Sequence, residues 1–236
     1  MSRKAKARDE LETRIAYTFA DKATLDRALT HVSAARRQGR GGSYQRLEFL
    51  GDHVLGLVVS DMLYRAFPKA DEGDLSRRLA DLVRRDTCAE IARAIDLGAA
   101  LNLGNSESNA GGRRRTATLA DACEALVGAV FVDGGYAAAA ALIDRLWRER
   151  MLKPSRPLRD PKTVLQEWAQ GRGLPTPAYR EVERSGPDHS PKFRVAVEIA
   201  DSPPAEGTGA SKRAAEQAAA AEMLAREGVA MDATNG

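Results

Sequence analysis

The chain has 236 residues, of which 43% are hydrophobic and 29% are charged, and its formal net charge is +3 at neutral pH. This length fits one large or two modest domains, and the composition excludes a disordered or fibrous chain. The charge is unequally divided: residues 1–159 carry 27 Lys and Arg against 21 Asp and Glu, whereas residues 160–236 carry 9 against 12. The net charge therefore identifies no partner by itself.

The N-terminus and the apolar segments predict a cytoplasmic protein. The first residues are basic, but no apolar stretch follows them as in a secretory signal. We expect no membrane span, because Glu48, Asp52 and Asp61 interrupt the long apolar run that contains them. Cys88 and Cys123 lie far apart within helical patterns, which favours buried free thiols over a disulfide or a metal site.

Two short helices are predicted at the start of the chain, over residues 8–19 and 21–31. Asp21 has the side chain and the position of an N-cap for the second helix, and His31 at its end is assigned no role. The basic, glycine-rich residues 36–43 follow. We interpret them as a surface connection, with contact to phosphate as the alternative.

A long apolar helix is predicted from Tyr44 to Tyr64. Gln45, Glu48 and Asp52 project from one face of it, because they are spaced by three and four residues. Charges beside so much apolar surface are costly to desolvate, and two acids cannot neutralise each other. A divalent cation would compensate both, although the acids also fit the solvated side of an ordinary amphipathic helix.

An acid also lies at the start of the next predicted helix. Pro68 ends the apolar helix, and we expect Gly73 to break the chain and Asp74 or Ser76 to cap the helix that follows. Glu72 lies just before this helix, where the helix dipole favours an acid without any functional role.

A second acidic pair lies on a second apolar helix, predicted from Thr118 to Asp133. Asp121 and Glu124 are three residues apart and share a face. Thr118 could cap this helix, which would make Asp121 part of a capping box, but Glu124 has no such explanation. The preceding residues 102–117 form a polar, glycine-rich loop whose three arginines could contact a phosphate backbone.

The segments QRLEFLGDHVLGL and LADACEALVGAVF together resemble the signature of the ribonuclease III family. The resemblance implies an all-helical endonuclease domain in which the two acidic helices meet. It also implies that Glu48, Asp52, Asp121 and Glu124 bind the metal and are catalytic, with Asp52 and Glu124 mattering most for hydrolysis.

Two further residues of the signature are expected to lie around these four acids. Where the family commonly has Asn-Glu, this chain has Tyr44-Gln45, and Gln keeps an acceptor oxygen but loses a charge. We therefore treat Gln45 as peripheral. The resemblance implies that Glu72 supports the metal site without binding the metal itself.

The chemistry of the four acids also points to a metal. Phosphodiester hydrolysis needs a water nucleophile, an in-line leaving oxygen and neutralisation of phosphate charge, and two hard cations about 4 Å apart can supply all three. Carboxylates without cysteine or histidine favour Mg²⁺ over zinc, and Mn²⁺ is the expected substitute.

The pattern changes after the helical part of the chain. We predict a helical domain over residues 1–151, a linker over 152–160, a second domain over 161–229 and a tail over 230–236. The second domain has the order helix, three strands, helix, and its clearest strand alternates apolar and polar residues in KFRVAVEIA. This order resembles a double-stranded-RNA-binding domain, and a generic α+β domain is the alternative.

Double-stranded RNA is recognised by its A-form shape, through 2′-hydroxyls and phosphates. The matching motifs nominate one face of the first helix, the loop between the first two strands, and the start of the last helix, where free N–H groups favour phosphate. The nominated residues are Thr163, Gln166, Glu167, Gln170, His189, Ser211, Lys212 and Arg213.

The resemblance implies a Mg²⁺-dependent endoribonuclease that cuts double-stranded RNA as a homodimer, with the signature helices at the interface. Phe49, beside the acids, is a candidate interface contact, and core packing is the alternative. The implied products carry 5′-phosphates, 3′-hydroxyls and two-nucleotide 3′ overhangs, and the implied tasks are ribosomal precursor processing and messenger RNA processing or decay. The competing hypothesis is an RNA-binding protein with weak or no cleavage, which Gln45 favours.

Overall fold

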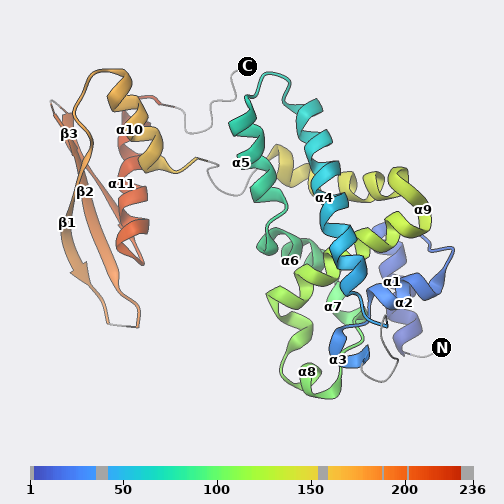
Figure 1. Cartoon of the computed structure of the whole chain (residues 1–236). Coiled ribbons are helices and arrows are strands. Elements are labelled where there is room, and N and C mark those ends of the chain that lie inside the picture. The colour runs from blue at the N-terminus through green and yellow to red at the C-terminus, as the bar shows by residue number, and fades with distance from the viewer. Residues whose placement is uncertain (1–2, 36–41, 154–158, 188, 201, 230–236) are drawn as a thin grey trace. The chain divides into compact units, whose positions relative to one another are not determined.

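The computed structural model describes residues 3–35, 42–153, 159–187, 189–200 and 202–229 (Figure 1). Most of the predicted basic connection at residues 36–43, much of the predicted linker and the predicted tail lie outside the described residues. The chain divides into two compact units, Met1–Lys153 and Pro154–Gly236. The first is helical and the second has the order α-β-β-β-α, which confirms the predicted fold class.

Two long helices form the centre of the first unit. They are α4 (Gln45–Ala66) and α9 (Thr116–Leu152), and their apolar faces enclose a core with Leu55 and Leu126. The other helices surround them: α1 (Arg3–Ile15), α2 (Lys22–Ala28), α3 (Val32–Ala35), α5 (Glu72–Leu82), α6 (Arg85–Ala94), α7 (Leu97–Ala100), α8 (Asn105–Asn109) and the 3₁₀ turn η1 (Gly112–Arg114). Cys88 and Cys123 are buried free thiols in this core, as predicted.

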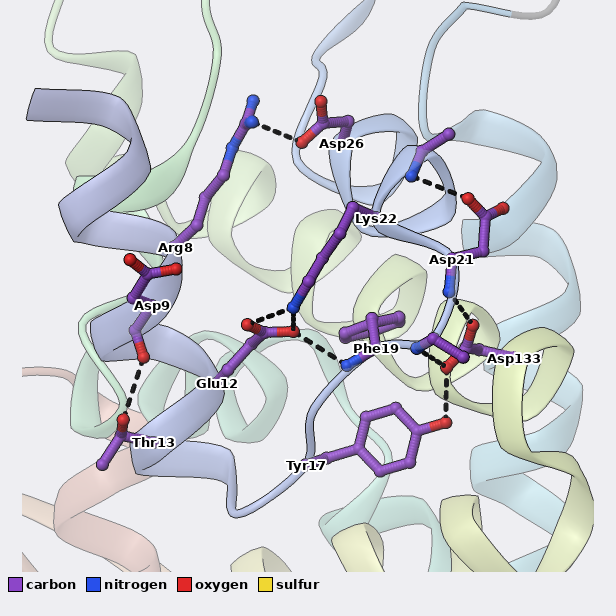
Figure 2. A network of polar contacts seen from close by, with 12 residues as sticks. Arg8, Asp9, Glu12, Thr13, Tyr17, Phe19, Asp21, Lys22, Asp26 and Asp133 are labelled. Atoms are coloured by element: carbon purple, nitrogen blue, oxygen red, sulfur yellow. Dashed lines mark hydrogen bonds and ion pairs between the residues drawn. The ribbon is translucent and has the colours of Figure 1, made fainter. Parts of the chain in front are cut away.

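The first helix ends at Ile15, earlier than its pattern predicted. Two carboxylates hold the chain that follows it (Figure 2). Glu12 accepts a hydrogen bond from the backbone N–H of Phe19 at 2.8 Å, and Asp133 of α9 accepts from the N–H groups of residues 20 and 21 at 2.9 and 2.8 Å. These tertiary bonds satisfy the backbone groups that a longer helix would have paired with its own carbonyls.

The caps of α5 and α9 also differ from those expected. Asp71 caps α5 by accepting from the N–H of Asp74 at 2.7 Å, so Glu72 is the first helical residue and Gly73 lies inside the first turn. Helix α9 begins at Thr116, which places Thr118 inside the helix and buried. Asp121 therefore lies beyond the first turn, and the capping-box explanation for this acid is wrong.

Helix α9 is interrupted at Gly135, whose φ of 75° and ψ of −171° are not helical. The acidic helix predicted from Thr118 to Asp133 is thus the first part of a longer element, which continues beyond this glycine to Leu152. By length and composition alone α9 could cross a membrane, which the prediction from the first apolar helix overlooked. Its contacts with α4 and α6 are equally those of the core helix of a soluble protein.

The second unit contains an antiparallel sheet in the order β1-β2-β3, and α10 (Pro161–Gly171) and α11 (Lys212–Arg226) lie against it (Figure 1). The strands are β1 (Ala178–Ser185), β2 (Lys192–Ile199) and β3 (Ser202–Gly209). The core between sheet and helices includes Leu165, Val197 and Leu224.

Candidate active site

The two acidic helices cross at a pair of glycines. A Cβ atom on Gly51 of α4 would lie 1.8 Å from the carbonyl oxygen of Glu124, and one on Gly128 of α9 would lie 2.1 Å from the carbonyl oxygen of Leu47. Both distances are far below van der Waals contact, so only glycine permits this backbone-to-backbone approach. The crossing occurs between Glu48 and Asp52 on one helix and beside Glu124 on the other, and it thereby brings the two acid pairs together.

The pKa values of these acids are raised, partly because the acids lie close to one another. Burial, followed by the charges of Asp52, Asp121 and Glu48, raises the pKa of Glu124 to about 7. Burial and the neighbouring charge of Asp121 raise the pKa of Glu48, and burial raises the pKa of Asp121. Carboxyl groups that share a partly desolvated site resist ionising together unless a cation compensates them.

Two cationic or titratable neighbours were not found from the sequence. Arg85, the first residue of α6, is close enough to lower the pKa of Glu48, Asp121 and Glu124, and His31 also lowers that of Asp121. Arg85 is the second of two adjacent arginines, and no sequence signal separates it from Arg84. The position of His31 beside Asp121 depends on tertiary packing.

The donor set suits a hard divalent cation, because all four side chains are carboxylates and the charges of neighbouring acids help to raise the pKa values of Glu48 and Glu124. Among the described residues, however, no three His, Cys, Asp or Glu side chains converge closely enough to form a preformed metal cage. Asp52 points outward, with 58% of its side chain exposed, while the other three are half-buried. This arrangement fits Mg²⁺, which keeps several waters and needs few protein ligands.

Two of the three arginines before α9 bind other groups of the first unit. The guanidinium of Arg113 donates to the carbonyl oxygens of Gly98 and Leu101 at 2.9 and 2.6 Å, and Arg115 pairs with Glu107 at 2.6 Å. The loop predicted over residues 102–117 is partly helical, because it contains α8 and η1. Two of the three arginines thus have internal partners besides any role toward phosphate.

The residues nominated for RNA contact all lie on the surface of the second unit. Those on α10 are exposed along one face, and His189 is exposed in the turn between β1 and β2. Ser211 caps α11 by accepting from the N–H of Ala214 at 3.2 Å. Lys212 and Arg213 are exposed beside it. The ammonium of Lys212 lies 4.0 Å from the carboxylate of Glu181, and the guanidinium of Arg213 lies 3.6 Å from that of Asp160.

Comparison with known proteins identifies both units. The family described as Ribonuclease-III-like matches residues 21–150, and the Double-stranded RNA binding motif matches residues 161–226. The chain belongs to the ribonuclease III family. It is 66% identical to Ribonuclease 3 of Nitrobacter winogradskyi, over 93% of this chain and 83% of that protein, and 62% identical to Ribonuclease 3 of Rhodopseudomonas palustris, over 96% and 83%.

A solved structure agrees with this assignment to the ribonuclease III family. The nuclease domain of ribonuclease III from Campylobacter jejuni is 38% identical, with a TM-score of 0.56, and the match covers 63% of this chain and 97% of that one. A second structure of the same domain is described as showing flexibility in a region involved in dimer formation.

Gln45 and Glu72, which the resemblance to the ribonuclease III family placed around the four acids, lie at the edge of the site or away from it. Gln45 is exposed at the start of α4, where Ser43 donates to it at 3.4 Å. Glu72 accepts from Ser76 at 2.8 Å and lines a groove beside the second half of α4, next to Tyr64. Within this chain, the structure does not bring Glu72 to the four acids.

Phe49 is 69% exposed, so core packing does not explain it. Leu57 and Tyr64, which are 60% and 73% exposed, share its sector of α4 at spacings of eight and fifteen residues. The groove between α4 and α5 has a volume of about 500 Å³, and Leu75 and Leu79 of α5 also line it. An apolar face of this kind on a single helix is typical of a protein–protein interface.

Proposed function

We propose that this protein is a Mg²⁺-dependent endoribonuclease that cleaves double-stranded RNA, leaving 5′-phosphates, 3′-hydroxyls and two-nucleotide 3′ overhangs. The observation that carries the proposal is the glycine crossing of α4 and α9, which gathers four carboxylates at one partly desolvated site. Family membership and the RNA-binding motif support the choice of substrate.

Glu48, Asp52, Asp121 and Glu124 would hold the metal, and Mn²⁺ should substitute for Mg²⁺. Bound cations supply a nucleophilic water and neutralise phosphate charge. The protein's own contribution is to keep the carboxylates close together on two rigidly packed helices. Arg85, facing three of them, offsets part of their repulsion while the site is free of metal.

The proposed enzyme is a homodimer in which each subunit cuts one strand. Its interface would cover the exposed face of Phe49, Leu57 and Tyr64, which adjoins the acidic stripe on the same helix. The second unit would hold the duplex through α10, His189 and the start of α11. We propose cytoplasmic action in ribosomal precursor and messenger RNA processing.

The test is cleavage of a long, perfectly paired RNA by the wild type and by Glu124→Gln, with Mg²⁺ and with EDTA. The wild type should cut only with metal and leave 3′ overhangs. The variant should lose about two to three orders of magnitude in rate, as is typical when one group that stabilises transition-state charge is removed. Its affinity for the duplex should remain unchanged.

The control is Gln45→Glu, which introduces the residue more common in the family. Its cleavage is compared with that of the wild type in the same assay. If the wild type binds duplex RNA without cutting it and Gln45→Glu cuts, the weak-nuclease hypothesis is correct and position 45 is its cause. Equal cleavage by both proteins supports the peripheral role assigned to Gln45.

A further inference from the structure

Two helices of the second unit carry the residues proposed to contact RNA, apart from His189 in the turn between β1 and β2. Helix α10 presents Gln166 and Gln170 to solvent, and α11 begins with the exposed Lys212 and Arg213. An A-form duplex offers its 2′-hydroxyls and phosphates at fixed spacings. The distance and register between the two helices therefore decide whether both sets of side chains can reach one duplex.

Near the start of α11, the buried apolar side chains are small. The buried side of α11 consists of Ala215, Ala219 and Ala220 from its start to its middle, and of the larger Met223 and Leu224 near its end. Small side chains form a smooth surface, and hydrophobic burial is not directional. Directional bonds at this end of α11 therefore add to the packing of Met223 and Leu224 in setting the spacing between the two helices.

Asp160 makes such bonds from a single carboxylate. Its Oδ1 accepts from the backbone N–H of Lys162 at 3.0 Å and caps α10, while its Oδ2 accepts from the side-chain amide of Gln217 on α11, also at 3.0 Å. The same oxygen lies 3.6 Å from the guanidinium of Arg213. The side chain is 31% exposed, so water screens these bonds only in part.

A second polar contact between α10 and α11 lies beside the hydrogen bond of Asp160 to Gln217. The ammonium of Lys162 contacts Glu216 of α11 at 2.5 Å and lies 4.5 Å above the ring of Tyr179 on β1. Because Lys162 is engaged within the fold, it reinforces the start of α10 rather than adding a free cation to the surface.

We propose that Asp160 is a positioning residue for binding of double-stranded RNA: its bond to Gln217 sets the spacing between the RNA-facing surface of α10 and the basic start of α11. Asp160 itself need not touch RNA. This inference rests on the proposed function of the second unit, and it adds a residue to that function that the RNA-contact motifs do not nominate.

The experiment compares three variants of the full chain, using fluorescence anisotropy with a perfectly paired RNA in EDTA. Asp160→Ser keeps a good helix cap but cannot reach Gln217. Gln217→Met leaves the cap untouched and removes the same bond from the other side. Asp160→Asn keeps groups that can both cap the helix and bond to the Gln217 amide after that amide turns over.

We expect Asp160→Ser and Gln217→Met each to raise the dissociation constant for RNA by roughly fivefold, as for the loss of one coupled interaction. The double variant should be no worse than either single variant, and Asp160→Asn should bind close to the wild type. In cleavage with Mg²⁺, the two disrupting variants should raise KM and leave kcat unchanged. Both should remain folded, with melting temperatures well above that of the assay.

Wild-type affinity in Asp160→Ser, or binding by Asp160→Asn as weak as that of Asp160→Ser, would overturn the positioning role. Failure of the proposed function looks different, because the wild type itself would then bind no duplex RNA. A loss in the double variant equal to the product of the single losses would also overturn it, since the two residues would then act independently.

Discussion

At the scale of single residues, the carboxyl group of Glu124 is the most strongly perturbed acid of the proposed site. Its pKa of about 7 reflects burial first and the charges of Asp52, Asp121 and Glu48 after that. In the unfolded chain these groups are hydrated and far apart, so the pKa of Glu124 would return to its ordinary value of about 4.5. Between these two pH values the folded state binds more protons than the unfolded state.

A fall in stability with rising pH follows from this difference. In EDTA, the free energy of unfolding of the first unit should decrease by about 1–3 kcal/mol from pH 5 to pH 8, since ionised Glu124 is disfavoured only when folded and solvent screens part of the effect. Urea unfolding followed by Trp147 fluorescence in a Trp168→Phe background measures it. Glu124→Gln should flatten the slope, and excess Mg²⁺ should restore stability near pH 8. A slope that persists unchanged in the variant would show that other groups cause it.

At the scale of secondary-structure elements, two glycines explain how α4 and α9 approach. Neither is needed for a turn, because both lie inside helices. Glycine at these places costs helix stability, roughly 0.5–1 kcal/mol relative to alanine. The close backbone contact offsets that cost, and it sets the distance between the acid pairs.

The contribution of this crossing can be measured by comparing two glycines of α4. Gly51→Ala should lower the free energy of unfolding by about 2–4 kcal/mol, because its Cβ would meet a backbone carbonyl that cannot turn away. Gly56→Ala is the matched control, since nothing in the chain lies within 4 Å of its Cβ, and in the monomer it should be neutral or stabilising by up to about 1 kcal/mol. Equal effects in urea unfolding would mean that helix propensity, and not the crossing, governs position 51.

At the scale of the whole molecule, the first unit has an exposed apolar face beside its acids. Phe49, Leu57 and Tyr64 lie within one sector of α4, adjoining the sector of Glu48 and Asp52. Exposure of three large apolar side chains on one helix costs free energy in water, and covering them with a second copy would recover it. A dimer formed in this way would keep both acidic sites near the interface.

Replacement of Phe49 by serine should weaken this dimer. We expect Phe49→Ser to raise the dissociation constant by roughly 100-fold, the size of effect seen for central interface residues, because each dimer loses two such side chains. Val132→Ser is the control, since Val132 is also exposed, at 53%, but lies on α9. Sedimentation equilibrium measures the dissociation constant of the dimer for each variant. Similar dimerisation by both variants would place the interface elsewhere.

The sequence by itself determined the features that depend on near neighbours in the chain. Helical spacing placed Glu48 with Asp52 and Asp121 with Glu124, and alternation placed the strand KFRVAVEIA, because both patterns repeat within a few residues. The order α-β-β-β-α followed from the same local patterns. The resemblance to the ribonuclease III family came from two short motifs, and the comparisons with known proteins confirmed it.

Only the tertiary structure decided which distant groups meet. It placed Gly51 against the backbone of Glu124, brought Arg85 to the acids, and ended α1 at Ile15 because Asp133 of α9 binds the N–H groups that follow. Contacts of this kind join residues tens of positions apart, and their geometry depends on how whole helices pack, which no local spacing encodes.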